Sequence, residues 1–173
     1  MDVDLHRAKR IYQKLMRLAP DLAGIKELAK SEVGGYMALS CEILEAGRDF
    51  RRIALGHYWT HPHGHKIPDP GMEVAVFLDW ELAEAMSYQD AFKFEDAYPI
   101  LGEPPDFAVH SSINCLLETW LDTLAEHGHL LRPSVSDRDR SSTTMLLPNE
   151  YEAECPTQIQ LPTDHFGNDE GHQ

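Results

Sequence analysis

The chain has 173 residues, of which 42% are hydrophobic and 25% are charged, as in an ordinary soluble globular protein. It is long enough to bury one core without disulfides, and no apolar run approaches the roughly 18 residues that cross a bilayer. The opening MDVDLHRAKRIYQKL has charges where a signal peptide has its apolar stretch, and the three cysteines lie far apart. We therefore expect a cytoplasmic protein with reduced thiols.

The net charge of −14 is distributed unevenly along the chain. Residues 67–130 contain one lysine and thirteen acidic residues, whereas residues 1–66 have a small basic excess. Nucleic acids and anionic membranes are bound largely through Lys and Arg, so this balance argues against both as partners. The simplest interpretation of the acidity is a solvated surface that aids solubility.

The N-terminal segment has the pattern of helices. Apolar residues recur every three or four positions over residues 5–18, and Asp2 or Asp4 is placed to cap this helix. A short second helix is predicted over residues 22–28, with Asp21 as its N-cap. We expect both helices to cover a sheet.

The middle of the chain alternates between apolar and polar residues, which predicts strands. Three segments alternate clearly, at residues 36–44, 50–59 and 72–80, and the aromatic stretch at 91–98 is a candidate fourth strand. The strands follow one another without an intervening helical segment. The pattern therefore predicts an antiparallel β-meander of three to four strands.

A final amphipathic helix is predicted after the strands. Apolar residues form one stripe over residues 113–124, and Ser111 or Ser112 is placed to cap it. Helices at both ends of a meander predict an α+β fold: N-terminal helices, then the sheet, then the C-terminal helix packed on one sheet face.

The character of the sequence changes after the last helix. Residues 131–173 have no sustained period and contain several prolines, serines and acidic residues, so we predict a flexible, acidic tail. Two short apolar segments within it, MLLPNEYEAE and TQIQLP, are candidates for docking on this domain or on a partner. The predicted organisation is one α+β domain over residues 1–130 followed by this tail.

Several patches of the chain resemble the bacterial YqiB-like family, a domain of unknown function. The resemblance is carried by YQKLMRLAPDL, PDPGMEVAVFLDWELAEA and INCLLETWLDTLAEHG, in that order, and covers about residues 10–129. It implies the fold and a cytoplasmic location but no activity. The chain departs from the family pattern at Leu78 and at residues 108–110, so chemistry built on those positions is not implied.

Common catalytic signatures are absent from the sequence. There is no GxxxxGK[ST] or GxGxxG phosphate loop, no GxSxG nucleophile elbow and no HExxH zinc helix. No residue is therefore assigned as catalytic and no cofactor is implied. Convergent active sites are recognised by geometry rather than by sequence, so an enzyme remains open.

The segment HYWTHPHGHKIPDPG is the most distinctive local pattern. His61, His63 and His65 have the i, i+2, i+4 spacing that places side chains on one side of an extended strand, where imidazoles can bind zinc, copper or nickel. Pro62 and Gly64 interrupt this spacing and favour an exposed turn. The metal site depends on whether the fold brings the three rings together.

Two functions remain open from the sequence. The favoured function is a non-catalytic module that binds a protein partner or a small ligand through its sheet face or acidic surface. The alternative is a metal-dependent, hydrolase-like enzyme in which the three histidines act with Asp79 or Glu81. We expect these two carboxylates on one face of the third strand.

Overall fold

A computed structural model describes residues 4–100 and 102–133. These residues belong to one unit, Met1–Ser136, and the remaining unit, Asp137–Gln173, lies outside them, as does nearly all of the predicted tail. The described elements, in chain order, are α1 (Leu5–Leu18), the 3-10 helix η1 (Leu22–Gly24), β1 (Leu28–Ser31), β2 (Leu39–Ala46), β3 (Phe50–Thr60), β4 (Lys66–Phe77), β5 (Leu82–Gln89), β6 (Phe94–Asp96) and α2 (Phe107–Glu126).

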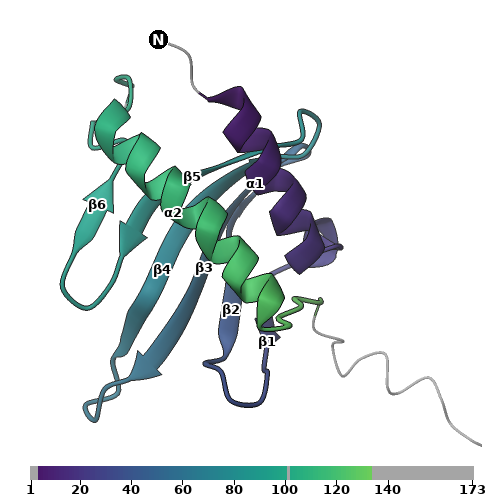
Figure 1. Ribbon diagram of the computed structural model, residues 1–173, viewed down its shortest axis with the longest axis vertical. Helices are drawn as coiled ribbons and strands as arrows, with labels where there is room; N and C mark the ends of the chain where they lie inside the picture. Colours follow the sequence, from purple (N-terminus) through teal and green to yellow (C-terminus); the bar gives the residue numbers. More distant parts are fainter. Residues whose placement is uncertain (1–3, 101, 134–173) are drawn as a thin grey trace, which may run out of the picture. The chain divides into compact units, whose positions relative to one another are not determined.

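The strands form a single antiparallel meander. Their order in the sheet is β1-β2-β3-β4-β5-β6, so each strand pairs with its neighbour in sequence. Both helices lie on the same face of this sheet (Figure 1). The α+β class is confirmed, and the number of strands is corrected from three or four to six.

The second N-terminal helix is much shorter than predicted. Asp21 does cap it, accepting a hydrogen bond from the Gly24 amide at 3.0 Å, but η1 is only three residues long. Leu28 already belongs to β1, where it pairs with Glu42 of β2. The helical spacing over residues 22–28 was therefore misleading, because pairing with β2 determines the conformation of this segment.

The strand β5 was not predicted, because LAEAMSYQ is rich in residues that favour helices. It is a strand because its alternate residues complete the sheet: Ala83 pairs with Val76 and Ala85 pairs with Val74. Both alanines are fully buried, and both helices contact this strand. Small side chains here let the helices approach the sheet closely.

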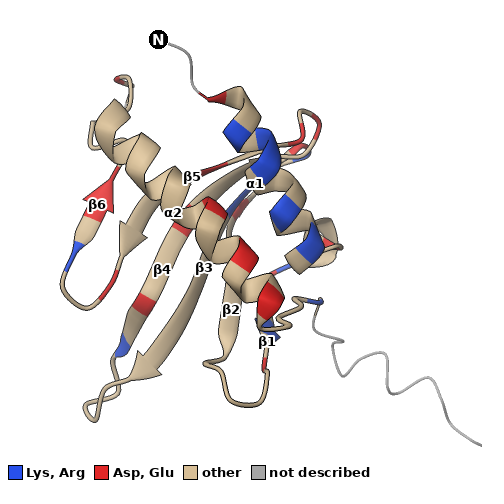
Figure 2. Cartoon of the chain, viewed as in Figure 1, with Lys and Arg blue, Asp and Glu red and all other residues tan. Residues whose placement is uncertain are grey.

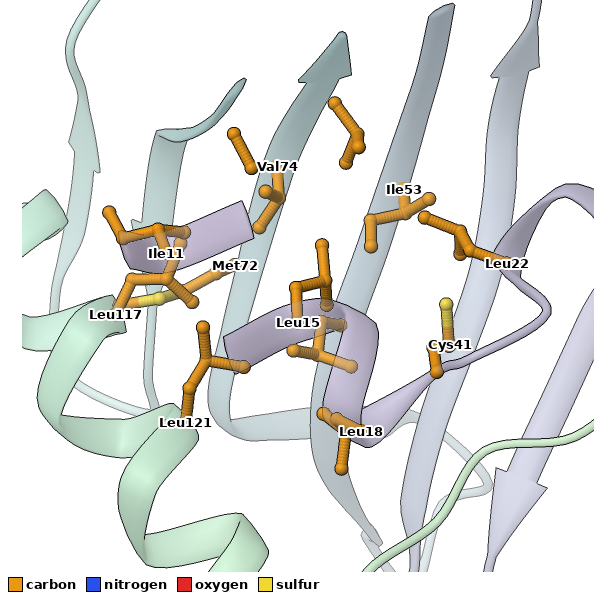
Figure 3. Packing of buried hydrophobic residues seen from close by; sticks show 14 of the residues in the cluster. Ile11, Leu15, Leu18, Leu22, Cys41, Ile53, Met72, Val74, Leu117 and Leu121 are labelled. Atoms are coloured by element: carbon orange, nitrogen blue, oxygen red, sulfur yellow. The ribbon is translucent and has the colours of Figure 1, made fainter. Parts of the chain in front are cut away.

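The core lies between the helices and the sheet (Figure 3). Ile11 and Leu15 of α1 and Leu117 of α2 meet Ile53 and Val74 of the central strands, and each is at most 1% exposed. Burying one such side chain stabilises the fold by about 1.5–3 kcal/mol relative to leaving it in water. This layer positions α1 and α2 on the sheet.

The N-cap residue predicted from the sequence is correct for α1 and wrong for α2. Asp4 caps α1, accepting the Arg7 amide at 3.0 Å. The cap of α2 is Asp106, not Ser111 or Ser112, and it accepts the amide two residues later at 3.0 Å. Within the described residues, no helix is long and apolar enough to cross a membrane.

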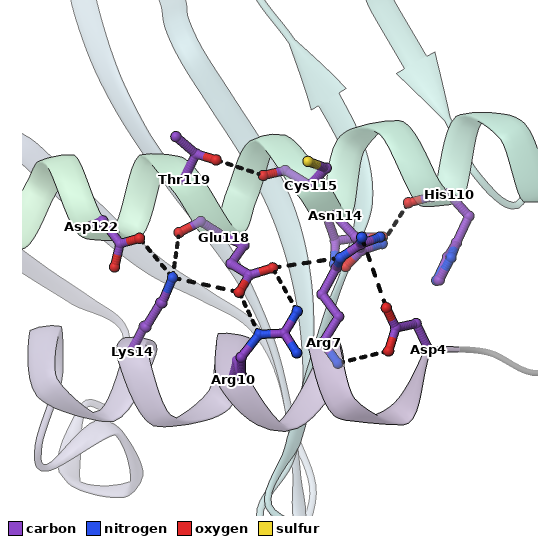
Figure 4. Close-up of polar contacts among 11 residues, drawn as sticks. Asp4, Arg7, Arg10, Lys14, His110, Asn114, Cys115, Glu118, Thr119 and Asp122 are labelled. Carbon is purple, nitrogen blue, oxygen red and sulfur yellow. Dashed lines mark hydrogen bonds and ion pairs between the residues drawn. The ribbon is translucent and has the colours of Figure 1, made fainter.

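Ion pairs join the two helices along their exposed side (Figures 2 and 4). Arg10 Nε lies 2.6 Å from Glu118 Oε1, and Lys14 Nζ lies 2.6 Å from Asp122 Oδ2. The hydrogen bond from Arg10, assisted by the charge of Lys14, lowers the pKa of Glu118. The basic side of α1 is thus matched by acidic residues of α2.

Candidate functional site

The three predicted histidine ligands lie in the turn between β3 and β4. The His61 amide donates to the His65 carbonyl at 2.8 Å, and Gly64 has a positive φ of 87°. The rings of His61 and His63 have centroids 5.1 Å apart. The expected exposed turn is present, and β4 begins directly after it, so that IPDPG belongs to the strand.

The two predicted carboxylate partners lie far from these histidines. Asp79 and Glu81 are in the turn between β4 and β5, not on a strand face, and β4 runs between the two turns. At about 3.3 Å per residue, this strand is roughly 40 Å long. The structure therefore separates the histidines from both carboxylates. Among residues 4–100 and 102–133, no three His, Cys, Asp or Glu side chains are arranged to hold a metal.

The sheet face opposite α1 and α2, here called the outer face, carries a different set of residues. Cross-strand pairing of β3 with β4 places four pairs on it in sequence: Phe50 with Phe77, Arg52 with Ala75, Ala54 with Glu73, and Gly56 with Gly71. Each of the two middle pairs therefore joins a small alanine to a charged side chain. In the described part of the chain, neither helix lies on this face.

A hollow of about 260 Å³, the central hollow, lies at the glycine end of the outer face. The glycines make room for its aromatic wall, since a Cβ on Gly56 would lie 2.9 Å from the Tyr58 ring. Burial raises the pKa of Tyr58, with a further contribution from the charges of Glu42 and Glu73. The hollow is lined by Ala54, Tyr58, Lys66, Pro68, Gly71, Met72, Glu73, Ser87, Gln89 and Phe94.

A larger hollow of about 400 Å³, the aromatic hollow, lies at the other end of β3 and β4. The Phe50 and Phe77 centroids are 5.4 Å apart, and Trp80 stacks on Phe77 at 5.7 Å and 21°. A hydrogen bond of 2.9 Å from the Leu78 amide to the Asp49 carbonyl joins the two turns around it. It is lined by Arg48, Asp49, Phe50, Phe77, Asp79 and Trp80.

A polar cluster connects the outer face to α2 around the β5 edge. Glu84 Oε1 accepts the Tyr98 hydroxyl at 3.0 Å, and its Oε2 lies 2.9 Å from His110 Nε2. Burial, with the adjacent carboxylate, raises the pKa of Tyr98, so its hydroxyl stays protonated. Both oxygens of Glu84 are engaged, which makes this cluster a clamp between β5 and α2.

Sequence reasoning did not identify this clamp. Glu84 lies in a segment whose composition favours a helix, and His110 stands out in the sequence only as a departure from a family pattern. Their contact joins residues 26 positions apart in sequence. Glu84 and His110 are recognised as neighbours only once β5 is known to pair with β4 beneath α2.

The outer face is acidic. Glu42, Glu73 and Glu84 lie on it by their pairing with Ala54 and Ala75, although Glu84 is engaged in the clamp. Arg52 and Lys66, which lines the central hollow, supply positive charges. Arg52 lies 3.6 Å from carboxylate oxygens of both Glu45 and Glu73. This arrangement of aromatic walls and surplus carboxylates is suited to binding a group that is both apolar and positively charged.

Comparison with known families identifies residues 14–130 as a protein of unknown function, DUF1249. The match spans both hollows and the clamp. No curated protein and no solved structure matches the chain. This match agrees with the YqiB-like resemblance in giving a domain of unknown function, but it does not confirm the YqiB-like family name. The chain belongs to the DUF1249 family of proteins of unknown function.

Proposed function

We propose that this protein is a non-catalytic binding module whose outer face takes a basic, partly apolar segment of a partner protein. The observation that carries the proposal is the outer face itself, where two hollows with aromatic walls lie among surplus carboxylates. We place this activity in the cytoplasm, where Cys41 and Cys115, both free thiols, stay reduced.

The spacing of the two hollows favours a protein segment over a small ligand. Phe77 lines the aromatic hollow and Gly71 lines the central hollow, and both are on β4. Six residues of strand separate them by roughly 20 Å. An extended chain of about six residues has the length to contact both hollows at once, whereas a small molecule fills one.

Charge complementarity argues for a basic partner. Glu42 and Glu73 lie beside the central hollow, where Lys66 is the one lysine or arginine among the lining residues. Asp49 and Asp79 lie at the aromatic hollow, where the one such residue is Arg48. The chain as a whole has a net charge of −14, which attracts cationic partners at long range. Opposed charges across an interface raise the association rate and exclude acidic competitors.

The proposal is tested by selecting peptides from a phage-displayed library of random 12-mers on the full-length protein. We expect enrichment of basic peptides with apolar residues, and their binding is then measured by calorimetry. Ala54→Arg, which places a cation in the central hollow, should abolish binding. Gln13→Arg adds the same side chain to the exposed side of α1 and should leave binding intact.

Two outcomes would overturn the proposal: no enrichment, or enriched peptides that bind Ala54→Arg as tightly as the wild type. Circular dichroism shows whether Ala54→Arg is folded. Glu73→Gln provides a second variant that removes a carboxylate without adding bulk, and it should weaken the binding of the same peptides. Enrichment of acidic peptides would contradict the assigned chemistry.

The alternative, a metal-dependent enzyme, is favoured by one observation: His61 and His63 lie side by side, with ring centroids 5.1 Å apart. Because Asp79 and Glu81 are at the far end of β4, this proposal now rests on the three histidines of the turn. Metal analysis of untagged protein tests it. A stoichiometric ion that is lost in a His61/His63/His65 triple alanine variant supports the site, and absence of the ion removes it.

A further inference from the structure

We propose that the aromatic hollow binds the guanidinium group of an arginine side chain presented by a partner protein. This inference rests on the proposed function, because it assigns one residue of the basic partner segment to one end of the outer face. It is carried by three features of the hollow: the aromatic stack, the two carboxylates beside it, and a cation at its rim.

The aromatic stack provides the surface. Trp80 is 69% exposed although its ring is held against Phe77, which in turn contacts Phe50. An indole ring held in place with much of its surface in water is a preformed platform for a planar cation. A cation over such a ring gains about 0.5–1 kcal/mol at an exposed site, which corresponds to a two- to fivefold change in affinity.

Carboxylates from two different turns provide the charge. Asp49 precedes β3 and Asp79 follows β4, and the 2.9 Å bond from the Leu78 amide to the Asp49 carbonyl holds the turns together. Both side chains are exposed. A guanidinium group can stack on an indole while its edge donates two parallel hydrogen bonds to a carboxylate, which a lysine ammonium cannot do. The geometry therefore favours arginine over lysine.

Removing the positive charge of Arg48 should change the affinity in opposite directions for a cationic and an anionic guest. The Arg48 side chain is 95% exposed, and its Nε lies 3.9 Å from Asp49 Oδ1, so it stands at the rim of the hollow. Its positive charge repels a cationic guest and competes for Asp49. Removing Arg48 should therefore strengthen the binding of an arginine side chain, whereas it would weaken the binding of an anionic guest.

The test uses the full-length protein and a nine-residue peptide with one central arginine, compared with the same peptide carrying citrulline, its neutral isostere. Affinities of the wild type and of every variant are measured by calorimetry, and the indole N–H signal of Trp80 in nitrogen-15 spectra locates the bound peptide in the wild type. We expect the arginine peptide to bind about tenfold more tightly. Trp80→Ala and Asp79→Asn should each weaken it about two- to fivefold, and Arg48→Ala should strengthen it.

Trp59→Ala is the matched control, because Trp59 is also partly exposed but lies at the opposite end of β3. It should leave the affinity for the arginine peptide unchanged. Equal affinity for arginine and citrulline peptides, or weaker binding in Arg48→Ala, would overturn the proposal. So would a dimer of the wild type that Trp80→Ala converts to monomers while the arginine peptide has no effect.

The proposed function and this inference fail in different ways. Selected peptides that are lost in Ala54→Arg but bind Trp80→Ala as tightly as the wild type support the binding module and overturn the arginine site. Selected peptides that bind Ala54→Arg normally overturn the outer face as the binding surface. Loss of binding in Ala54→Arg and weaker binding in Trp80→Ala, with normal binding in Trp59→Ala, supports both.

Discussion

The side chain of Asn114 closes the edge of the sheet, and replacing it should be among the most damaging single changes in α2. Its Oδ1 accepts the Ala85 amide at 2.8 Å, and its Nδ2 donates to the Ala85 carbonyl at 3.2 Å. The strand β6 pairs with β5 only from Ser87 to Gln89, so Asn114 takes the place of a neighbouring strand at Ala85.

The expected cost of Asn114→Ala follows from these contacts. Asn114 is 3% exposed and Ala85 is fully buried, so both backbone groups of Ala85 lose their partner away from water. Each unsatisfied buried group costs about 1–3 kcal/mol, and some relief comes from water that enters the space left by the side chain. We expect a loss of about 2–4 kcal/mol, against a total stability of about 5–15 kcal/mol for a natural domain.

Urea unfolding followed by circular dichroism measures this loss. Ser112→Ala is the control, because Ser112 is exposed on the same helix and its replacement should cost little. Asn114→Asp retains an acceptor for the Ala85 amide but has no donor for its carbonyl and introduces a buried charge, so it should also be destabilised. The reasoning is refuted if Asn114→Ala lies within about 0.5 kcal/mol of Ser112→Ala at an unchanged denaturant slope.

Three further predictions follow from the pKa shifts. Burial, then the charges of His57 and His127, lower the pKa of His129 below 6.5, so the unfolded chain binds a proton that the folded chain resists. Wild-type stability should fall, relative to His129→Gln, as the pH drops through 6.5; parallel pH curves from urea unfolding contradict this. Burial raises the pKa of Cys41 to about 12, so iodoacetamide should alkylate the exposed Cys115 of the folded protein long before Cys41. Mass spectrometry measures the labelling of each cysteine, and equal rates at the two positions would refute the burial of Cys41. Because the pKa of Glu118 is lowered in the folded state, Glu118→Gln should be less stable than the wild type at pH 7. This difference in stability should vanish as the pH falls below 4.5 and Glu118 becomes protonated. A difference that persists in acid excludes the ion pairs as its cause.

The elements that the sequence predicted well are those whose periodicity is complete within one segment. The helix α1, the strands β2 and β3, and β4 from Met72 to Phe77 carry their buried residues at the spacing that their own conformation requires. The first half of β4, Lys66–Gly71, has no such pattern. The strands β1 and β5 are not predicted, because β1 has four residues and β5 has a helix-favouring composition. Their conformation is imposed by the neighbouring strand.

The candidate site was beyond the sequence for a related reason. Recognising the outer face requires the register that pairs Gly56 with Gly71 and Phe50 with Phe77, and register is a property of two strands. The histidine turn was found because its residues are contiguous. Asp79 and Glu81 were assigned to the same strand face as each other, but the strand ends at Phe77 and both lie in the following turn.

The helix pair also explains why the outer face is the acidic side of the domain. Much of the basic excess of the N-terminal residues lies on α1, where Arg7, Arg10 and Lys14 approach Glu118 within 3.5 Å (Figure 4). Those cations are matched within the chain and leave the carboxylates of the opposite face only partly compensated, by Arg52, by Lys66 at the central hollow and by Arg48 at the aromatic hollow. Charges are neutralised within the chain on the helical side of the sheet, so a cationic partner is attracted mainly to the outer face. Raising the salt concentration should therefore weaken partner binding more than it weakens the fold, since the core is apolar and the partner contacts are exposed.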